Sequence, residues 1–251
     1  MYIQITTRCN MTCSHCCFSC TARGHDMTFD NFKKAIAIAV EHDSMITIGG
    51  GEPTIHPQFQ EFLMYAVWEL ASVACSNGTP AVGLVTNGSM TETAINLARL
   101  AESGVIWARV SKDPYHDPID PKVFKAFERP KRDHYNPSPR DERDHRDIGG
   151  ANGLIQRMGR AKSWGDRSMK DGCCGGLFIH PTGKIYPCDC RQGCIGTLDD
   201  QRNISYDLFQ GYCVSSKEYK AEILPNLQPW QQDLKVHHVT DARAKPELVA
   251  A

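Results

Sequence analysis

The chain has 251 residues, 41% of them hydrophobic, which suits one large domain or a domain with an appendage. Its formal net charge of −1 gives no electrostatic reason to expect nucleic acid or an anionic membrane as a partner, and no apolar stretch is long enough to span a bilayer. Twelve cysteines without a secretory signal indicate a reducing, cytoplasmic setting, where cysteine clusters bind metals or take part in catalysis.

The first half of the chain alternates strand and helix patterns. We expect strands at 2–6, 44–48, 81–85 and 105–110, and helices at 29–41, 59–73 and 91–101. This alternation predicts an α/β fold with a parallel sheet and crossover helices. Because ligands of such sheets collect at the carboxyl ends of the strands, the loops containing Cys9, Gly49, Thr86 and Ser111 are candidates for one site.

Three cysteines, Cys9, Cys13 and Cys16, follow the first predicted strand in a CxxxCxxC spacing. They supply one ligand fewer than a closed tetrahedral site needs, so an iron–sulfur cluster held by them would keep one iron open. The spacing leaves another interpretation open, because Cys13 and Cys16 with Cys17 and Cys20 could form a structural zinc knuckle.

The second predicted strand runs into Gly49-Gly50-Gly51-Glu52-Pro53. Glycines allow a ligand to approach the backbone closely, and the Glu52 carboxylate suits an ammonium group. A zinc-binding module has no reason to carry this turn, which therefore favours a ligand-binding enzyme.

The cysteine spacing and the Gly50-Gly51-Glu52-Pro53 turn together resemble the radical S-adenosylmethionine (radical SAM) enzymes, over about residues 2–115. The resemblance implies a partial (β/α)6 TIM-like barrel and a 4Fe–4S cluster on Cys9, Cys13 and Cys16, whose open iron binds S-adenosylmethionine. Reductive cleavage of this cofactor would give a 5′-deoxyadenosyl radical that abstracts a hydrogen from substrate. An external electron donor of the flavodoxin or ferredoxin type would reduce the cluster. His15 occupies the place where the family has an aromatic or similar flat residue.

The same resemblance suggests residues that contact S-adenosylmethionine. Gly50, Gly51 and Glu52 would meet its methionine amino group, whereas Thr86, Asn87 and Ser111 would lie at its ribose or carboxylate. The residues themselves leave an ordinary turn open at Thr86-Asn87-Gly88, and a strand-end hydroxyl without a ligand at Ser111.

Residues 131–147 differ in composition, with ten charged residues out of seventeen, five of each sign. Such a stretch is a solvated loop or a lid over the mouth of a barrel. A fifth strand could follow at 153–158. Gly159-Arg160-Ala161 resembles a tripeptide found late in the barrel of some family members, where Arg160 could meet a carboxylate or lie on the surface.

A second group of cysteines surrounds a predicted β-hairpin, 177–180 and 184–186, that turns at Pro181-Thr182-Gly183. It resembles the twitch and SPASM extensions that hold auxiliary iron–sulfur clusters, so we expect a radical SAM core at 1–165 and a small cysteine-rich β-hairpin extension with a tail at 166–251. The expected ligands are Cys173, Cys188, Cys194 and Cys213, with Cys174 and Cys190 as substitutes. A tetrathiolate zinc site fits the same residues.

The chain begins at the first predicted strand, so we expect no preceding domain that captures a leader peptide. The expected substrate is a peptide or protein that undergoes crosslinking, thioether formation or epimerisation; dehydrogenation of a small alcohol or sugar is the alternative. Tyr115, His116 and Asp117 could contact it, although the residues favour a polar loop with a turn at Pro114 and Pro118. Cys17 or Cys20 could donate a proton or a hydrogen atom. A non-catalytic zinc or iron–sulfur module is the competing class.

Overall fold

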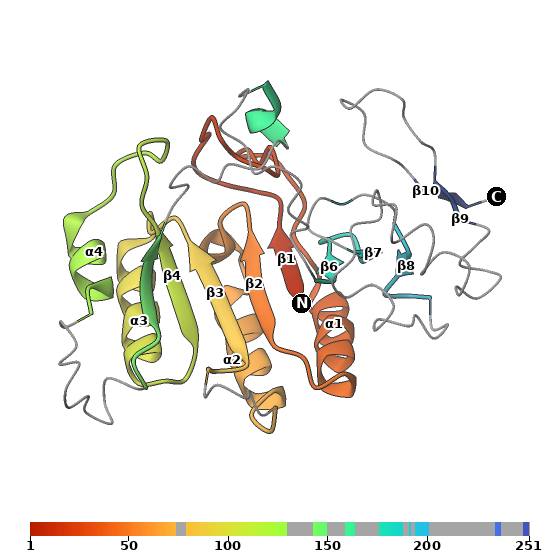
Figure 1. The fold of residues 1–251 in the computed structure, drawn as a ribbon, viewed down its shortest axis with the longest axis horizontal. Helices are drawn as coiled ribbons and strands as arrows, with labels where there is room; N and C mark the ends of the chain where they lie inside the picture. Colours follow the sequence, from red (N-terminus) through yellow and green to blue (C-terminus); the bar gives the residue numbers. More distant parts are fainter. Residues whose placement is uncertain are drawn as a thin grey trace.

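A computed structural model describes residues 1–73, 79–129, 143–149, 159–163, 176–187, 191, 194–200, 234–236 and 248–250. Eight strands of this described part form one mostly parallel sheet in the order β5-β4-β3-β2-β1-β6-β7-β8 (Figure 1). The elements of the first half are β1 (Tyr2–Thr6), α1 (Phe29–Glu41), β2 (Ile46–Gly50), η1 (Pro53–Ile55), α2 (Phe59–Glu69), β3 (Val82–Thr86), α3 (Thr91–Glu102), β4 (Trp107–Ser111) and α4 (Pro121–Phe127). The remaining elements are β5 (Arg146–Gly149), η2 (Gly159–Ser163), β6 (Phe178–Ile179), β7 (Lys184–Tyr186), β8 (Gly196–Thr197), β9 (Leu234–Val236) and β10 (Leu248–Ala250).

The predicted α/β fold is confirmed, since β1 to β5 pair in parallel with their neighbours in the sheet. Helix α1 begins after Thr28, as the sequence predicts, because the Thr28 hydroxyl accepts a hydrogen bond from the Asn31 backbone N–H. Helix α2 ends at Glu69 rather than near Val73. Its last turn tightens there, with Ala71 N–H bonded to the Trp68 carbonyl three residues back.

The fifth strand of the sheet is Arg146–Gly149, at the end of the charge-rich stretch, and it pairs with β4. The expected strand at 153–158 lies outside the described residues, as do residues 131–142 of the stretch 131–147 for which a solvated loop or a lid was expected. The charged composition of this stretch predicted a loop or a lid, whereas its end forms β5. The charged side chains can lie in the sheet because they are paired. Arg109 on β4 bonds Asp147, and Arg146 bonds Asp144.

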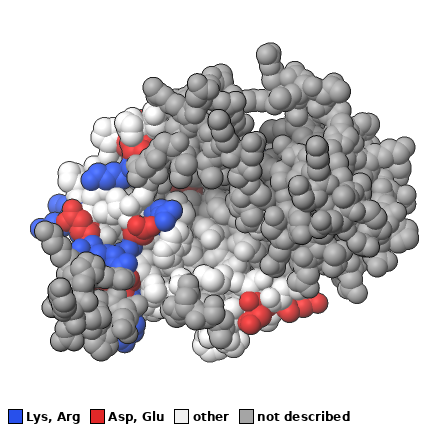
Figure 2. Space-filling model, in the orientation of Figure 1, with Lys and Arg blue, Asp and Glu red and all other residues white. Residues whose placement is uncertain are grey.

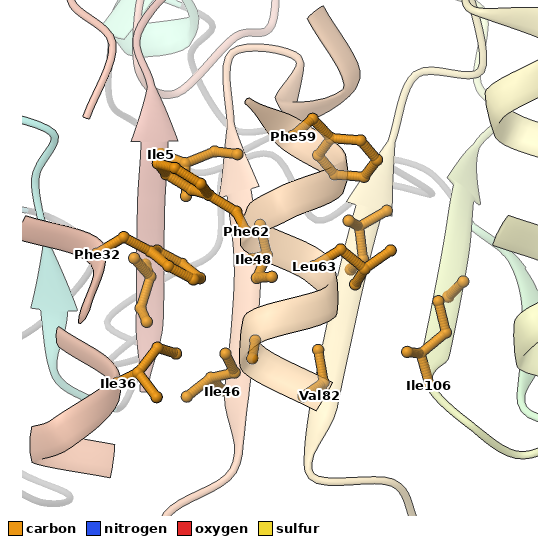
Figure 3. Packing of buried hydrophobic residues seen from close by; sticks show 14 of the residues in the cluster. Ile5, Phe32, Ile36, Ile46, Ile48, Phe59, Phe62, Leu63, Val82 and Ile106 are labelled. Atoms are coloured by element: carbon orange, nitrogen blue, oxygen red, sulfur yellow. The ribbon is translucent and has the colours of Figure 1, made fainter. Parts of the chain in front are cut away.

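The hydrophobic core lies between one face of the sheet and helices α1 to α3 (Figure 3). Ile5 on β1 and Ile48 on β2 point to this face, because side chains alternate along a strand. The rings of Phe32 on α1 and Phe62 on α2 stack against each other with centroids 4.3 Å apart. This packing fixes the strands and therefore the loops at their ends.

The opposite face of the sheet is more polar. The registers place Tyr2, Thr47, Gly83 and Trp107 in one row across it, and Val85 is paired with Arg109 in the next row. In Figure 1 the arrows of β1 to β4 all point to the same edge of the sheet, where the loop after β1 and the short helix η2 also lie. The site predicted from the sequence lies at this edge.

The hairpin region joins the main sheet through β6, which pairs in parallel with β1 and antiparallel with β7. Strand β7 pairs with β8, and β9 with β10 in a separate antiparallel pair. Closure of the sheet into a partial barrel, a cysteine-rich extension and a boundary at residue 165 remain predictions.

Charged side chains of both signs lie next to one another on the face in Figure 2, over the end of the molecule that carries α3 and α4 in Figure 1. This mixture agrees with the near-neutral net charge of −1. Within the described residues, the helices are all too short or too polar to cross a bilayer.

Candidate functional site

The loop after β1 brings Cys9, Cys13 and Cys16 to the wall of a cavity of about 360 Å³. All three are free cysteines; Cys9 is buried and the other two are partly exposed. The loop returns to β1, because Met27 N–H donates to the Ile5 carbonyl at 2.8 Å. Three thiols around one cavity are a donor set that suits an iron–sulfur cluster.

The thiols of this loop differ in acidity. Burial raises the pKa of Cys9, and it raises the pKa of Cys13 to about 11. A hydrogen bond from the Cys20 thiol lowers the pKa of Cys16 despite its burial, and the same interaction raises the pKa of Cys20. Without a metal, Cys16 is therefore the first of these cysteines to become a thiolate.

Cys9 Sγ already accepts two hydrogen bonds. They come from Met11 N–H at 3.4 Å and from the Asn87 side-chain amide at 3.8 Å. Asn87 also donates to Asn10 Oδ1 at 3.1 Å, so the turn after β3 contacts the cysteine loop directly. Donors to a ligating sulfur are one of the means by which a protein sets a cluster's potential.

Gly51, the residue after β2, is required by the cysteine loop itself. A Cβ at Gly51 would lie 2.1 Å from the Arg8 carbonyl oxygen and 2.8 Å from Cys9 Cβ. Gly51 N–H bonds the Thr6 carbonyl, and Glu52 N–H bonds the Arg8 carbonyl. Gly50 and Gly51 also line the cavity, so their backbone is available to a ligand.

Glu52 is fully buried and its carboxylate is surrounded by donors. Oε1 accepts from the backbone and hydroxyl of Thr54 at 3.1 and 2.6 Å and from the Thr86 hydroxyl at 2.8 Å, while Oε2 accepts from Asn87 N–H at 2.6 Å. Burial raises the pKa of Glu52, and these donors oppose that rise. In this structure the carboxylate connects two turns, so the predicted contact of its oxygens with an ammonium group remains a prediction.

Thr86 and Ser111, both predicted to contact the cofactor, differ in position. The Thr86 hydroxyl donates to Glu52 and accepts from Gly88 N–H, which gives it a role within the protein. Ser111 and Asn87 line the cavity together with the cysteines.

A cluster of polar side chains that the sequence indicated only in part lies beside Cys13. His15 and His116 both line the cavity. One ring nitrogen of each histidine and Cys13 Sγ all lie within 4.8 Å of one another, a spacing that could hold a metal ion. Asp113 was missed; its buried carboxylate bonds His116 Nδ1 at 2.8 Å and lies 3.5 Å from His15 Nε2. The sequence feature that could have indicated Asp113 is its position two residues after the end of β4.

The Nδ1 atom of His15 is buried without a hydrogen-bond partner among the described residues. Burial lowers the pKa of His15, which favours the neutral ring. Tyr115 packs its ring against His15 at 5.1 Å. A neutral ring with an unpaired nitrogen beside the cysteines fits a bound group that supplies the missing partner.

Two arginines of the described residues also line the cavity. Arg160 is partly buried and donates to backbone carbonyls of the cysteine loop, so it is not a free surface arginine. Arg109, which the sequence analysis did not single out, is held by Asp147 on one side and lies 5.1 Å from the centroid of the Trp107 ring.

Of the second cysteine group, Cys173, Cys174, Cys188, Cys190 and Cys213 lie outside the described residues, as does Cys75. Cys194 is described: its thiol is partly exposed and donates to the Gly196 carbonyl at 3.3 Å. Arg191 places its guanidinium 5.1 Å from the centroid of the Phe18 ring in the first cysteine loop. The predicted auxiliary ligands thus remain predictions.

Comparison with known proteins relates this site to a family. A family model described as the Radical SAM superfamily matches residues 3–130. A curated relative from Pyrococcus furiosus, named tungsten-containing aldehyde ferredoxin oxidoreductase cofactor-modifying protein, is 34% identical over 122 residues, which cover 45% of this chain. The match spans only 30% of that relative's length.

Solved structures share the fold at low identity. BtrN in complex with AdoMet and 2-DOIA has a TM-score of 0.56 at 16% identity, with 83% of each chain covered. Native anSMEcpe with bound AdoMet has a TM-score of 0.49 at 13% identity, with 87% of each chain covered. The first likeness shows a common fold and nothing finer.

Proposed function

The chain belongs to the radical SAM superfamily, and from that premise we propose that it cleaves S-adenosylmethionine reductively and uses the resulting radical to abstract hydrogen from a peptide or protein substrate. The family's cofactors are a 4Fe–4S cluster and S-adenosylmethionine. The observation that carries the proposal is the meeting of Cys9, Cys13 and Cys16 with Gly50 and Gly51 on one cavity.

Cys9, Cys13 and Cys16 would hold the cluster, and the three thiols with the unpaired nitrogen of His15 fit that group. When bound, the cluster and S-adenosylmethionine supply a 5′-deoxyadenosyl radical. The protein would bind, orient and enclose them. The backbone of Gly50 and Gly51 would receive the methionine part.

Ser111 and Asn87 would contribute polar groups to the ribose or carboxylate of S-adenosylmethionine, since both line the cavity. Glu52 and Thr86 would act one layer behind, by holding the turns after β2 and β3 together. An external one-electron donor of the flavodoxin or ferredoxin type would reduce the cluster.

The peptide or protein substrate is inferred from the resemblance to family members with a cysteine-rich extension. The curated relative is named as a protein that modifies another enzyme's cofactor, which keeps a small-molecule substrate as the second candidate. Radical dehydrogenation of an alcohol or sugar belongs to this second candidate.

An auxiliary iron–sulfur cluster in the second cysteine group is part of the proposal. Its support is positional: Arg191, which lies between Cys190 and Cys194 in the sequence, contacts Phe18 of the first cysteine loop. Cys173, Cys188, Cys194 and Cys213 are the proposed ligands. A zinc site on the same residues is the alternative.

The test of the proposed activity is anaerobic reconstitution with iron and sulfide, followed by reduction with dithionite in the presence of S-adenosylmethionine. We expect 5′-deoxyadenosine from the wild-type chain and none from Cys13→Ala. If fully reconstituted wild-type protein releases no 5′-deoxyadenosine, the enzymatic proposal is wrong and a non-catalytic metal-binding module takes its place.

The substrate is tested by adding peptide libraries or polyols and amino sugars that carry deuterium at carbon. Transfer of deuterium into 5′-deoxyadenosine from one set identifies its class. Transfer only from the small molecules would reject the peptide proposal and leave S-adenosylmethionine cleavage intact.

The auxiliary site is tested in a chain that lacks the first one. Cys9, Cys13 and Cys16 are all changed to alanine, and iron, sulfide and zinc are then counted after reconstitution. Iron and sulfide in this variant, reduced by a further Cys194→Ala change, would support the auxiliary cluster, whereas zinc alone or no metal would contradict it.

A further inference from the structure

Arg160 contacts the cysteine loop through three separate hydrogen bonds. Its backbone N–H donates to the Cys16 carbonyl at 3.0 Å, its Nε to the Cys13 carbonyl at 2.8 Å, and its Nη1 to the Cys20 carbonyl at 2.7 Å. Two of these carbonyls belong to proposed cluster ligands. Arg160 lies on η2, more than 140 residues later in the chain than Cys13, so the contact depends entirely on tertiary structure.

Gly159, the residue before Arg160, also packs closely on the cysteine loop. Gly159 has a φ of +53°, and a Cβ there would lie 2.4 Å from the carbonyl oxygens of both Cys16 and Cys17. Backbone atoms cannot move aside as a flexible side chain can. The start of η2 is therefore packed directly on the cysteine loop.

The loop from Cys13 to Cys20 has little regular structure of its own. Its local backbone bonds include Cys16 N–H to the Cys13 carbonyl and Ser19 N–H to the Cys16 carbonyl, at 3.2 and 3.3 Å. Partly buried carbonyls need donors, and a planar guanidinium with fixed N–H groups can satisfy two at once and hold them at a set separation. Arg160 does this for the carbonyls of Cys13 and Cys20.

The guanidinium also places a positive charge at the wall of the cavity that the thiols line. A cluster becomes more negative on reduction, so a nearby fixed cation stabilises its reduced form. The other arginine of this wall, Arg109, has its charge compensated by Asp147 in a contact of 2.5 Å.

Building on the proposed cluster site at Cys9, Cys13 and Cys16, we infer that Arg160 is a positioning residue that holds the cysteine loop in its ligating conformation and raises the reduction potential of the cluster. This role differs from a contact with the carboxylate of a substrate or of S-adenosylmethionine, because the Nε and Nη1 groups already donate to the protein backbone.

The test compares Arg160→Met, which removes the charge and the donors, with Arg160→Lys, which keeps the charge. The matched control from the same cavity is the double variant Arg109→Met/Asp147→Asn, which removes an arginine together with its partner charge. Each full chain is reconstituted. Cluster loss to an iron chelator, the midpoint potential in an electron paramagnetic resonance titration, and the perturbation of that spectrum by S-adenosylmethionine are then measured. Backbone hydrogen exchange of the cysteine loop is measured before reconstitution.

For Arg160→Met we expect cluster loss at least roughly tenfold faster, in line with other residues that support metal ligands, and a more negative midpoint potential. Arg160→Lys should keep the wild-type potential with an intermediate rate of cluster loss. The double variant Arg109→Met/Asp147→Asn should match the wild type in both, because it leaves no unpaired charge. Exchange of the loop amides should rise in Arg160→Met and not in this double variant, which tests the role even if Arg160→Met retains no iron.

Unchanged cluster lifetime, potential and loop exchange in Arg160→Met would overturn the inference, and weaker binding of S-adenosylmethionine as the sole effect would assign Arg160 to the ligand instead. If Arg160→Met and Arg160→Lys lose the cluster at the same rate and neither changes the midpoint potential, the inferred effect of Arg160 on the reduction potential is rejected. A wild-type chain that binds no cluster would contradict the proposed function itself, an outcome distinct from all of these.

Discussion

The backbone N–H of Asn87 donates to Glu52 Oε2 at 2.6 Å and thereby joins the turn after β3 to the turn after β2. The side chain of Asn87 extends the connection to Cys9 Sγ at 3.8 Å. A buried carboxylate, a backbone amide and a proposed cluster ligand therefore form one continuous set of contacts. Changes at Glu52 should reach the cysteine loop through Asn87.

Replacing Glu52 with glutamine should destabilise the fold. A glutamine side chain has only one oxygen that can accept hydrogen bonds. In one orientation its NH₂ group would face Asn87 N–H, and in the other it would face the donors of Thr54 and Thr86, all of which now donate to the carboxylate. Losing such bonds to a charged, buried group costs about 2–3 kcal/mol. Anaerobic urea unfolding of the cluster-free chain measures the free energy of unfolding.

The control for this change is Glu61→Gln on helix α2, where the carboxylate is exposed and bonds Gln58. We expect its free energy of unfolding to stay within about 0.5 kcal/mol of the wild type. Equal stability of the two variants would show that the buried contacts of Glu52 contribute little.

Alanine at Gly51 should displace the cysteine loop. The added Cβ would meet the Arg8 carbonyl oxygen at 2.1 Å, and that backbone atom is fixed by its bond from Glu52 N–H. We expect a loss of about 3 kcal/mol in the free energy of unfolding and little iron after reconstitution. Gly149→Ala is the matched control at the end of β5, because the atoms nearest to its Cβ would belong to the flexible side chain of Arg109, at 3.0 Å.

For Gly149→Ala the loss should be below about 1 kcal/mol, with wild-type iron content. A Gly51→Ala chain that binds iron normally would mean that the cysteine loop tolerates the shift, contrary to the packing in this structure.

Cys16 should react with iodoacetamide at lower pH than Cys13 in the cluster-free chain. The hydrogen bond from Cys20 lowers the pKa of Cys16, whereas burial raises the pKa of Cys13 to about 11. Since the thiolate is the reactive form, alkylation of Cys16 should already proceed below pH 7, and that of Cys13 should keep rising above pH 9. Mass spectrometry of peptides after timed alkylation measures both rates.

Cys20→Ala removes the donor and should move the alkylation profile of Cys16 to higher pH. Arg160→Lys keeps a positive charge near Cys16 and should move it less. An unchanged Cys16 profile in Cys20→Ala would show that another group stabilises its thiolate.

Asp144 should contribute to stability in a pH-dependent way. Burial alone would raise the pKa of Asp144, but hydrogen bonds from Arg146, including Nη2 to Oδ2 at 2.7 Å, hold it below the usual range. A carboxyl with a depressed native pKa stabilises the fold above its unfolded pKa of about 3.9 and loses this contribution as pH falls through the native value. Asp144→Asn should therefore cost about 2 kcal/mol at pH 7.

The difference in free energy of unfolding between wild type and Asp144→Asn should stay constant from pH 7 to pH 5 and shrink only below about pH 4. Asp120→Asn, at the start of α4, controls for a general effect of acid. A difference that shrinks already between pH 7 and pH 5 would contradict a depressed native pKa.

The sequence by itself predicted β1 to β4 and α1 to α3, though not α4, and it placed Cys9, Cys13 and Cys16 at the carboxyl end of β1. These features depend on periodicity and on neighbours within a few residues. It also singled out Gly50 and Gly51, although for the approach of a ligand rather than for their contact with the cysteine loop. The local pattern carries these signals because each element buries its own apolar face.

Only the tertiary structure decided which distant groups meet the cysteine loop. Arg160 was predicted to meet a carboxylate or lie on the surface, Asp113 was not singled out, and Glu52 was assigned to a ligand. In the structure Arg160 bonds the cysteine loop, the Asp113 carboxylate lies 3.5 Å from His15 of that loop, and Glu52 bonds Asn87. Strand β5 was hidden by its charges, which are paired in the structure: Asp147 with Arg109 of β4, and Arg146 with Asp144. Pairing between charges and between buried polar groups depends on distances in space, and residue spacing along the chain does not record those distances.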